Sequence, residues 1–169
     1  MKKSKRIKKS NSWKIKQHRD QFFKKSKILG YRSRASFKLI EINKKYKFLD
    51  KSTNLLDLGS SPGGWSQVAS QTITEGKIMS MDINEMKPIK NVKFLKRDIF
   101  DEKNKNEVIS YFNSRIDVIL SDMAADTTGN KSLDSIRTNL LCAEVINFSK
   151  DVLKPKGVLV SKLFMGEDF

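Results

Sequence analysis

The chain has 169 residues, 38% of them apolar, which is enough for one domain with its own core. Its single cysteine, Cys142, excludes an internal disulfide framework and fits a reducing, cytoplasmic setting. No apolar run reaches transmembrane length, and no apolar segment follows the basic N-terminus as it would in a secretory signal. One cysteine and one histidine make no metal cluster, so we expect no metal. The N-terminal segment MKKSKRIKKS shows no strong apolar face, so we expect no membrane partner.

The formal net charge of +15 is concentrated at one end of the chain. Residues 1–40 hold 15 Lys and Arg against one acid, Asp20, while the remaining residues are nearly neutral. Aromatic residues interleave this charge: Trp13, Phe22, Phe23 and Tyr31. Dense basic charge favours a polyanionic partner, and aromatic rings suit stacking on bases. RNA or a ribosomal particle is therefore favoured over a solvated tail or an anionic membrane.

Two parts are expected along the chain, a basic arm at 1–30 and an α/β domain at 31–169. Within the arm, residues 1–12 are typical of a flexible segment and residues 13–29 of a basic, weakly amphipathic helix. The next segment, YRSRASFKLIEINKKYKF, predicts a stronger helix with Ser33 as its N-cap. Its predicted apolar face consists of Ala35, Leu39, Ile42 and Tyr46.

Beyond this helix the pattern alternates between strands and helices. We predict strands at 53–59, 77–83, 92–99, 116–123 and 157–164. We predict helices after Gly64, at 104–112 and at 132–153, with the proline and glycine of KPKG ending the last one. Such alternation predicts a Rossmann-like, mostly parallel sheet with helices on both faces.

Four acids lie at or near the carboxyl ends of the first four predicted strands: Asp57, Asp82, Asp98 and Asp122. Ligands of parallel sheets bind beyond this edge, so the four acids predict one crowded site. The competing explanation is that aspartate is common wherever strands run into turns.

The turn LDLGSSPGGW supplies glycines for positive φ and close backbone approach to a ligand: Gly59, Gly63 and Gly64. It lacks the Gly-Lys-Ser/Thr ending of a P-loop, and Ser61 stands where a dinucleotide fingerprint needs glycine. S-adenosylmethionine fits the pattern better. Asp57 can balance its ammonium, Asp82 can accept from both ribose hydroxyls, and Asp98 can accept from the adenine amino group. Trp65 is expected either to contact this cofactor or to pack in the core.

The motifs DLGSSPGGWSQ, YRSRASFKL, SDMA, LKPKG and SKLFMGEDF together resemble the FtsJ/RrmJ family of S-adenosylmethionine-dependent ribose 2′-O-methyltransferases. The resemblance runs from about residue 13 to the end. It implies the Rossmann-like methyltransferase fold and methylation of a ribose, in the bacterial branch a uridine, in large-subunit ribosomal RNA. It also implies that the basic N-terminal segment binds RNA. We further expect a monomer.

The family carries a Lys–Asp–Lys–Glu catalytic group, and its first three members match Lys38, Asp122 and Lys162. In the implied roles, Lys162 is the base or the stabiliser of the alkoxide, and Lys38 is a second cation. Asp122 would orient Lys162 and face the methyl donor. A hydroxyl needs such help because it is a weak nucleophile at neutral pH.

The chain departs from the family in two places. The last helix and two strands of the family, with its catalytic Glu, have no counterpart, and Glu167 does not match that motif position. We therefore expect an incomplete domain whose fifth strand, 157–164, presents an unpaired apolar edge. The loop Asp126–Gly129 also replaces the usual Pro-Asn stretch. Two alternatives stay open: a non-catalytic relative that binds ribosomal RNA, and a methyltransferase acting on transfer RNA or an mRNA cap.

Overall fold

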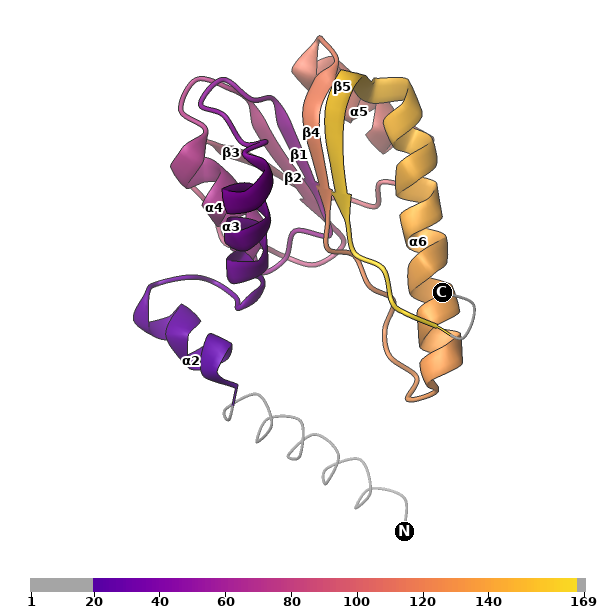
Figure 1. Cartoon of the computed structure of the whole chain (residues 1–169). Helices are drawn as coiled ribbons and strands as arrows, with labels where there is room; N and C mark the ends of the chain where they lie inside the picture. The colour runs from indigo at the N-terminus through magenta and orange to yellow at the C-terminus, as the bar shows by residue number, and fades with distance from the viewer. Residues whose placement is uncertain (1–19, 167–169) are drawn as a thin grey trace.

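The computed structural model describes residues 20–166, which form a five-stranded sheet with helices on both faces (Figure 1). The strands are β1 (Leu55–Leu58), β2 (Ile78–Asp82), β3 (Val92–Lys96), β4 (Ile116–Ser121) and β5 (Leu153–Ser161). All neighbouring strands are parallel, in the order β3-β2-β1-β4-β5. This confirms the predicted parallel α/β architecture. The segment 1–12, Trp13 and Glu167 lie outside the described residues.

Helices cover the sheet in two layers (Figure 1). They are α2 (Gln21–Ile28), α3 (Ala35–Tyr46), α4 (Gly64–Thr72), α5 (Glu102–Phe112) and α6 (Lys131–Val152). Leu55 packs in a cluster with residues of α3 and α4, whereas its neighbour Leu56 packs in a second cluster with residues of α5 and α6. Because successive strand residues point to opposite faces, β1 is buried on both sides. None of the helices among residues 20–166 has the length and apolar character needed to span a bilayer.

The helix α2 precedes the sheet and lies to one side of it (Figure 1). Asp20 caps it by accepting hydrogen bonds from the main-chain N–H groups of Phe22 (2.8 Å) and Phe23 (3.3 Å). The same carboxylate forms an ion pair with Arg34, directly before α3. The described part of the predicted helix 13–29 is thus helical, and a single acid ties it to the next helix.

Two predicted details of α3 are wrong. Arg34, not Ser33, is its N-cap, and its side chain makes no capping hydrogen bond. Tyr46 is 65% exposed, whereas Ser36 and Leu39 are fully buried. The buried face is shifted because the Ser36 hydroxyl donates to the Gly64 carbonyl at 3.0 Å, which packs α3 closely on α4.

The prediction that the proline and glycine of KPKG end α6 is wrong. The helix ends at Val152, and Leu153 is already extended and pairs with Ile116 of β4. The segment forms the first part of β5, with a register shift opposite Ile116 and Val118. β5 therefore begins four residues earlier than the predicted 157, and it lies at one edge of the described sheet.

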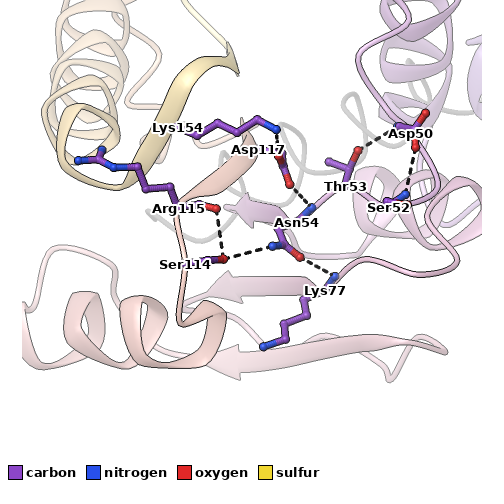
Figure 2. A network of polar contacts seen from close by, with 9 residues as sticks. All are labelled: Asp50, Ser52, Thr53, Asn54, Lys77, Ser114, Arg115, Asp117 and Lys154. Carbon is purple, nitrogen blue, oxygen red and sulfur yellow. Dashed lines mark hydrogen bonds and ion pairs between the residues drawn. The ribbon is translucent and has the colours of Figure 1, made fainter.

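A polar network joins the amino ends of four strands (Figure 2). Asn54 donates its main-chain N–H to the Asp117 carboxylate at 2.7 Å, and its carbonyl accepts from the N–H of Asp117 at 3.0 Å. Its side-chain oxygen accepts from the N–H of Lys77 at 3.0 Å, and Asp117 also forms an ion pair with Lys154. These contacts lie at the end of the sheet opposite the predicted site, so they have a structural role.

Candidate active site

A cavity of about 370 Å³ opens at the carboxyl edge of the sheet. Its volume lies within the range of about 300–1,000 Å³ that is usual for small-molecule sites. Three of the four predicted acids line it: Asp82, Asp98 and Asp122. Apolar walls come from residues such as Ile99, Phe100 and Leu141. The parallel topology thus gathers acids from separate strands around one hollow, as their positions in the sequence predict.

Hydrogen bonds from main-chain N–H groups hold the side chains of Asp82 and Asp98. Asp82 ends β2, and its two oxygens accept from the N–H groups of Ser61 (2.8 Å) and Asn84 (2.7 Å). Asp98 lies two residues beyond β3, not within it, and accepts from the N–H of Phe100 at 3.0 Å. Each carboxylate oxygen can accept a second hydrogen bond, so both acids retain acceptors for a ligand.

The glycines of the turn are required first by packing. Gly59 has φ +69°, and an added Cβ would lie 2.9 Å from the Met123 Cα. Gly63 has φ +104°, and its Cβ would lie 2.9 Å from the Met86 sulfur. A side chain on Gly64 would run into the Ser33 hydroxyl. Close approach of a ligand would add to these constraints at Gly59, which lines the cavity, and at Gly64, which borders a smaller hollow beside it.

Asp57 differs from the other three acids because it is fully buried on the sheet face under α4. Its Oδ2 accepts a 2.5 Å hydrogen bond from the Ser66 hydroxyl, which lies 2.7 Å from the Ser80 hydroxyl. Burial raises the pKa of Asp57 to about 7, assisted by the nearby charges of Asp122 and Asp82 and opposed by the Ser66 hydrogen bond. This carboxyl group therefore titrates near neutral pH.

Asp57 also borders a small second hollow, which shares Gly59, Ser61 and Asp122 with the main cavity. Two buried oxygens on its wall have no hydrogen-bond partner among the described residues: Oδ1 of Asp57 and Oγ of Ser60. Buried polar atoms normally find a partner. The hollow has a volume of about 20 Å³, so a polar group of about the size of a water molecule fits there as their partner.

Trp65 belongs mainly to the core. Its side chain is 5% exposed and packs with Leu39 and Val68. The indole N–H donates to the Ala35 carbonyl at 2.8 Å, so it anchors α3 to α4. It also borders the small hollow, and contact with a cofactor stays a prediction.

Lys162 and Asp122 form the central pair of the site. Each follows directly on the last residue of its strand, β5 or β4, and the hydrogen bond from the Lys162 N–H to the Ser121 carbonyl (2.9 Å) keeps the two strand ends aligned. The Lys162 ammonium lies 2.8 Å from the Asp122 carboxylate and donates to the Asp122 main-chain carbonyl at 2.7 Å. Both side chains stay about a quarter exposed, so a substrate can reach them.

Within residues 20–166 the third predicted catalytic residue, Lys38, forms no hydrogen bond or ion pair with these two residues. Lys38 lies on the exposed side of α3. Its assignment as a second cation stays a prediction.

Asp134 is a residue of this region that the sequence reasoning missed. It accepts hydrogen bonds from Thr128 N–H (2.7 Å), Thr128 hydroxyl (2.8 Å) and Gly129 N–H (3.3 Å). The Thr128 hydrogen bonds hold the pKa of Asp134 below its usual value. The signal available in the sequence was an acid in the first turn of a helix capped by Asn130. The loop between β4 and α6 is thereby fixed beside the cavity.

Residues 31–169 match the FtsJ-like methyltransferase family. The chain belongs to this family. It is 42% identical over 168 residues to a ribosomal RNA large subunit methyltransferase E of Rickettsia akari, covering 96% of this chain and 74% of the relative. A protein of the same name from Pelagibacter ubique is 42% identical over 160 residues, covering 95% of this chain and 79% of the relative. A crystal structure of a Plasmodium falciparum protein described as a ribosomal RNA methyltransferase superposes with a TM-score of 0.76. It is 33% identical, and the match covers 82% of this chain and 81% of that one.

The resemblance to FtsJ-like methyltransferases is thus confirmed, and with it the Rossmann-like fold and the methyltransferase class. A member of this family uses a methyl donor. Among the residues that the structure describes, no group of three or more His, Cys, Asp and Glu side chains is placed to hold a metal ion.

Proposed function

We propose that this chain transfers a methyl group from S-adenosylmethionine to a ribose 2′-hydroxyl, that of a uridine, in large-subunit ribosomal RNA. The observation that carries the proposal is the Lys162–Asp122 ion pair beside the cavity. The names of relatives that are 42% identical support the choice of ribosomal RNA. The proposal also takes the protein to act in the cytoplasm as a monomer.

The cavity and the small second hollow beside it suit S-adenosylmethionine. Asp82 would accept from the ribose hydroxyls and Asp98 from the adenine amino group, beside the apolar wall that includes Phe100. The ammonium of the methionine end would reach into the hollow of about 20 Å³ that is bordered by Asp57, Ser60 and Gly64, near Trp65. There the unpartnered Asp57 Oδ1 would face the ammonium. A positive charge at this point would favour the ionised carboxylate.

The bound cofactor supplies an electrophilic methyl group, and its transfer forms a carbon–oxygen bond at the ribose while a carbon–sulfur bond breaks and the 2′-hydroxyl proton is released. Lys162 would lie beside the 2′-oxygen and stabilise the charge that develops as the proton leaves. Asp122 accepts from the ammonium through both its carboxylate and its main-chain carbonyl, which leaves one N–H group to point at the substrate. Lys38 would add positive charge from α3 once RNA is bound.

We assign RNA binding to the basic arm, 1–30. The described part of this arm carries exposed cations on α2, among them Lys24, Lys25 and Lys27. The ammonium of Lys25 lies 5.2 Å from the Phe37 ring centroid, and Phe22 is 51% exposed beside it. Cations interleaved with aromatic rings suit a backbone-tracking RNA contact rather than base-specific readout.

Calorimetric titration with S-adenosylmethionine, beside a circular dichroism melt, tests the cofactor. Transfer of labelled methyl groups to large ribosomal subunits that lack the modification, followed by nucleoside analysis, tests the product. We expect binding, a cooperative melt and a 2′-O-methyluridine. RNA binding without cofactor binding would replace the proposal by a non-catalytic RNA-binding relative. Transfer to transfer RNA or to a cap, but not to ribosomal subunits, would replace the substrate.

A further inference from the structure

After β5 the chain leaves the sheet and runs beside the first turns of α6 (Figure 1). Asn139 of α6 holds this segment by a two-way contact with the main chain of Phe164. The Phe164 N–H donates to Asn139 Oδ1 at 3.1 Å, and the Asn139 amide nitrogen donates to the Phe164 carbonyl at 3.1 Å. The Ser135 hydroxyl donates to the same carbonyl at 3.0 Å. One amide therefore satisfies both main-chain groups of Phe164.

This contact bears on Lys162, which lies two residues before Phe164. On its other side, Lys162 makes a hydrogen bond through its N–H to Ser121 of β4 (2.9 Å). Its main chain is thus fixed by the sheet at one point and by Asn139 shortly after it. The ammonium lies 5.9 Å from the Phe164 ring centroid, so the residue held by Asn139 also borders the charged group.

The same turns of α6 hold the chain that follows Asp122. The Ala125 N–H donates to the Thr138 hydroxyl at 3.3 Å, and Asp134 binds Thr128 in the same loop. Segments that follow two different strands are therefore tied to neighbouring residues of a single helix. A helix is rigid over two turns, so it can fix the distance between the two side chains that these segments carry.

We propose that Asn139 is a positioning residue that holds Lys162 against Asp122 through the main chain of Phe164. The proposal rests on the proposed function for the importance of the pair to methyl transfer, but the positioning itself is a property of the chain alone. The alternative is that Asn139 contributes only to overall stability. The two differ in which lysines become mobile when the amide is removed.

The test measures acetylation rates of individual lysines by acetic anhydride, followed by peptide mass spectrometry, on the full 169-residue chain. Lys77 is the internal reference, because its ammonium donates to the Tyr111 carbonyl (3.2 Å) at the far end of the sheet. In Asn139→Ala we expect Lys162 to react about tenfold faster, which corresponds to about 1.4 kcal/mol, with the Lys77 rate unchanged. Ser135→Ala, which removes one hydrogen bond to Phe164, should give a smaller increase at Lys162.

Asn147→Ala is the matched control, because Asn147 is an exposed asparagine of the same helix whose side chain accepts from Lys150 at 3.2 Å. It should leave the Lys162 rate unchanged. An unchanged Lys162 rate in Asn139→Ala and Ser135→Ala would overturn the proposal, and so would a parallel rise at Lys77, which marks general loosening. If Asn139→Ala does not fold, Ser135→Ala alone decides.

This experiment needs neither cofactor nor RNA, so its result is independent of the proposed function. Methyl transfer gives a second readout. Asn139→Ala should lower kcat about tenfold and change KM little, because the contacts that bind RNA and cofactor before the reaction remain. Full transfer by Lys162→Ala would end the proposed function even if labelling showed the contact with Asn139. Loss of transfer in Lys162→Ala, with unchanged Lys162 labelling in Asn139→Ala, would end only the positioning role.

Discussion

The ammonium of Lys162 lies 2.8 Å from the carboxylate of Asp122, although 40 residues separate them in the chain. The pairing of β5 with β4 produces this contact, because each residue directly follows its strand. The carboxyl ends of two parallel neighbours must lie side by side. The register of the two strands alone therefore places a lysine against a carboxylate that lines the cavity.

Replacing Lys162 by alanine should abolish methyl transfer and leave cofactor affinity nearly unchanged. We expect a fall in kcat of about 10²–10⁴-fold, the usual contribution of a positioned proton-transfer group. Transfer assays and calorimetric titration measure the two effects separately. Lys154→Ala is the matched control, because Lys154 pairs with Asp117 at the opposite end of the sheet. Near-normal transfer in Lys162→Ala would contradict the assignment.

The pKa of Asp57, raised from 3.8 to about 7, predicts a pH-dependent stability. Between these values the unfolded chain is ionised while the folded chain keeps the proton. This contribution to stability is therefore complete below about pH 4 and is lost as pH rises through about 7. Between pH 5 and pH 8 the loss is about 2–3 kcal/mol on this reasoning.

The variant Asp57→Asn isolates this effect, because it keeps the shape of the side chain and an acceptor for Ser66 but cannot ionise. Urea unfolding at pH 5 and pH 8 should show wild type losing stability relative to Asp57→Asn as pH rises. Titrations elsewhere in the chain cancel in the difference between the two proteins. Equal pH profiles would mean that Asp57 is ionised throughout.

Gly59→Ala should destabilise the fold more than Gly30→Ala does. Both glycines have nearly the same φ, +69° and +71°, so alanine suffers the same backbone strain of about 1–2 kcal/mol at either position. Only at Gly59 does the new Cβ also meet Met123, whereas nothing lies within 4 Å at Gly30. The difference in unfolding free energy between the variants measures that clash, and cofactor affinity should fall only in Gly59→Ala. Equal losses would show that Met123 moves aside at no cost.

The sequence predicts those parts of the site that depend on strand ends and on motifs. Asp82, Asp98 and Asp122 could be placed at one edge because parallel strands end together. Asn139 could not be linked to Phe164, because a side chain that binds main chain 25 residues away leaves no periodic signal. The prediction for the KPKG segment is wrong for the same reason, because a contact between residues far apart in the sequence determines its structure. Proline and glycine are local signals, but pairing of Leu153 with Ile116 decides the local structure.

Asp117→Ala should lower stability by about 1–3 kcal/mol, because it leaves the Asn54 N–H without its acceptor. Asp117→Asn keeps an acceptor for that N–H and removes only the charge that faces Lys154. That partly exposed pair contributes about 0–1 kcal/mol, so this variant should stay close to wild type. Urea unfolding of the two variants separates the contribution of the Asn54 hydrogen bond from that of the ion pair with Lys154. Methyl transfer should survive in both variants. A large loss in Asp117→Asn would assign the stability to the ion pair instead.

Removing residues 1–12 should weaken RNA binding and flatten its dependence on salt. The segment MKKSKRIKKSNS carries no acid, so each of its cations that meets a phosphate adds about 0.7–0.9 to the slope of log K against log [salt]. Binding of the full and shortened chains to ribosomal RNA over a range of salt concentrations measures this slope. A variant with the six cations of this segment changed to glutamine keeps the length and should match the deletion. If the slope stays unchanged in both, the segment does not contact the phosphates, and the contact falls to the other cations of the basic arm, which include Lys24 and Lys27 of α2.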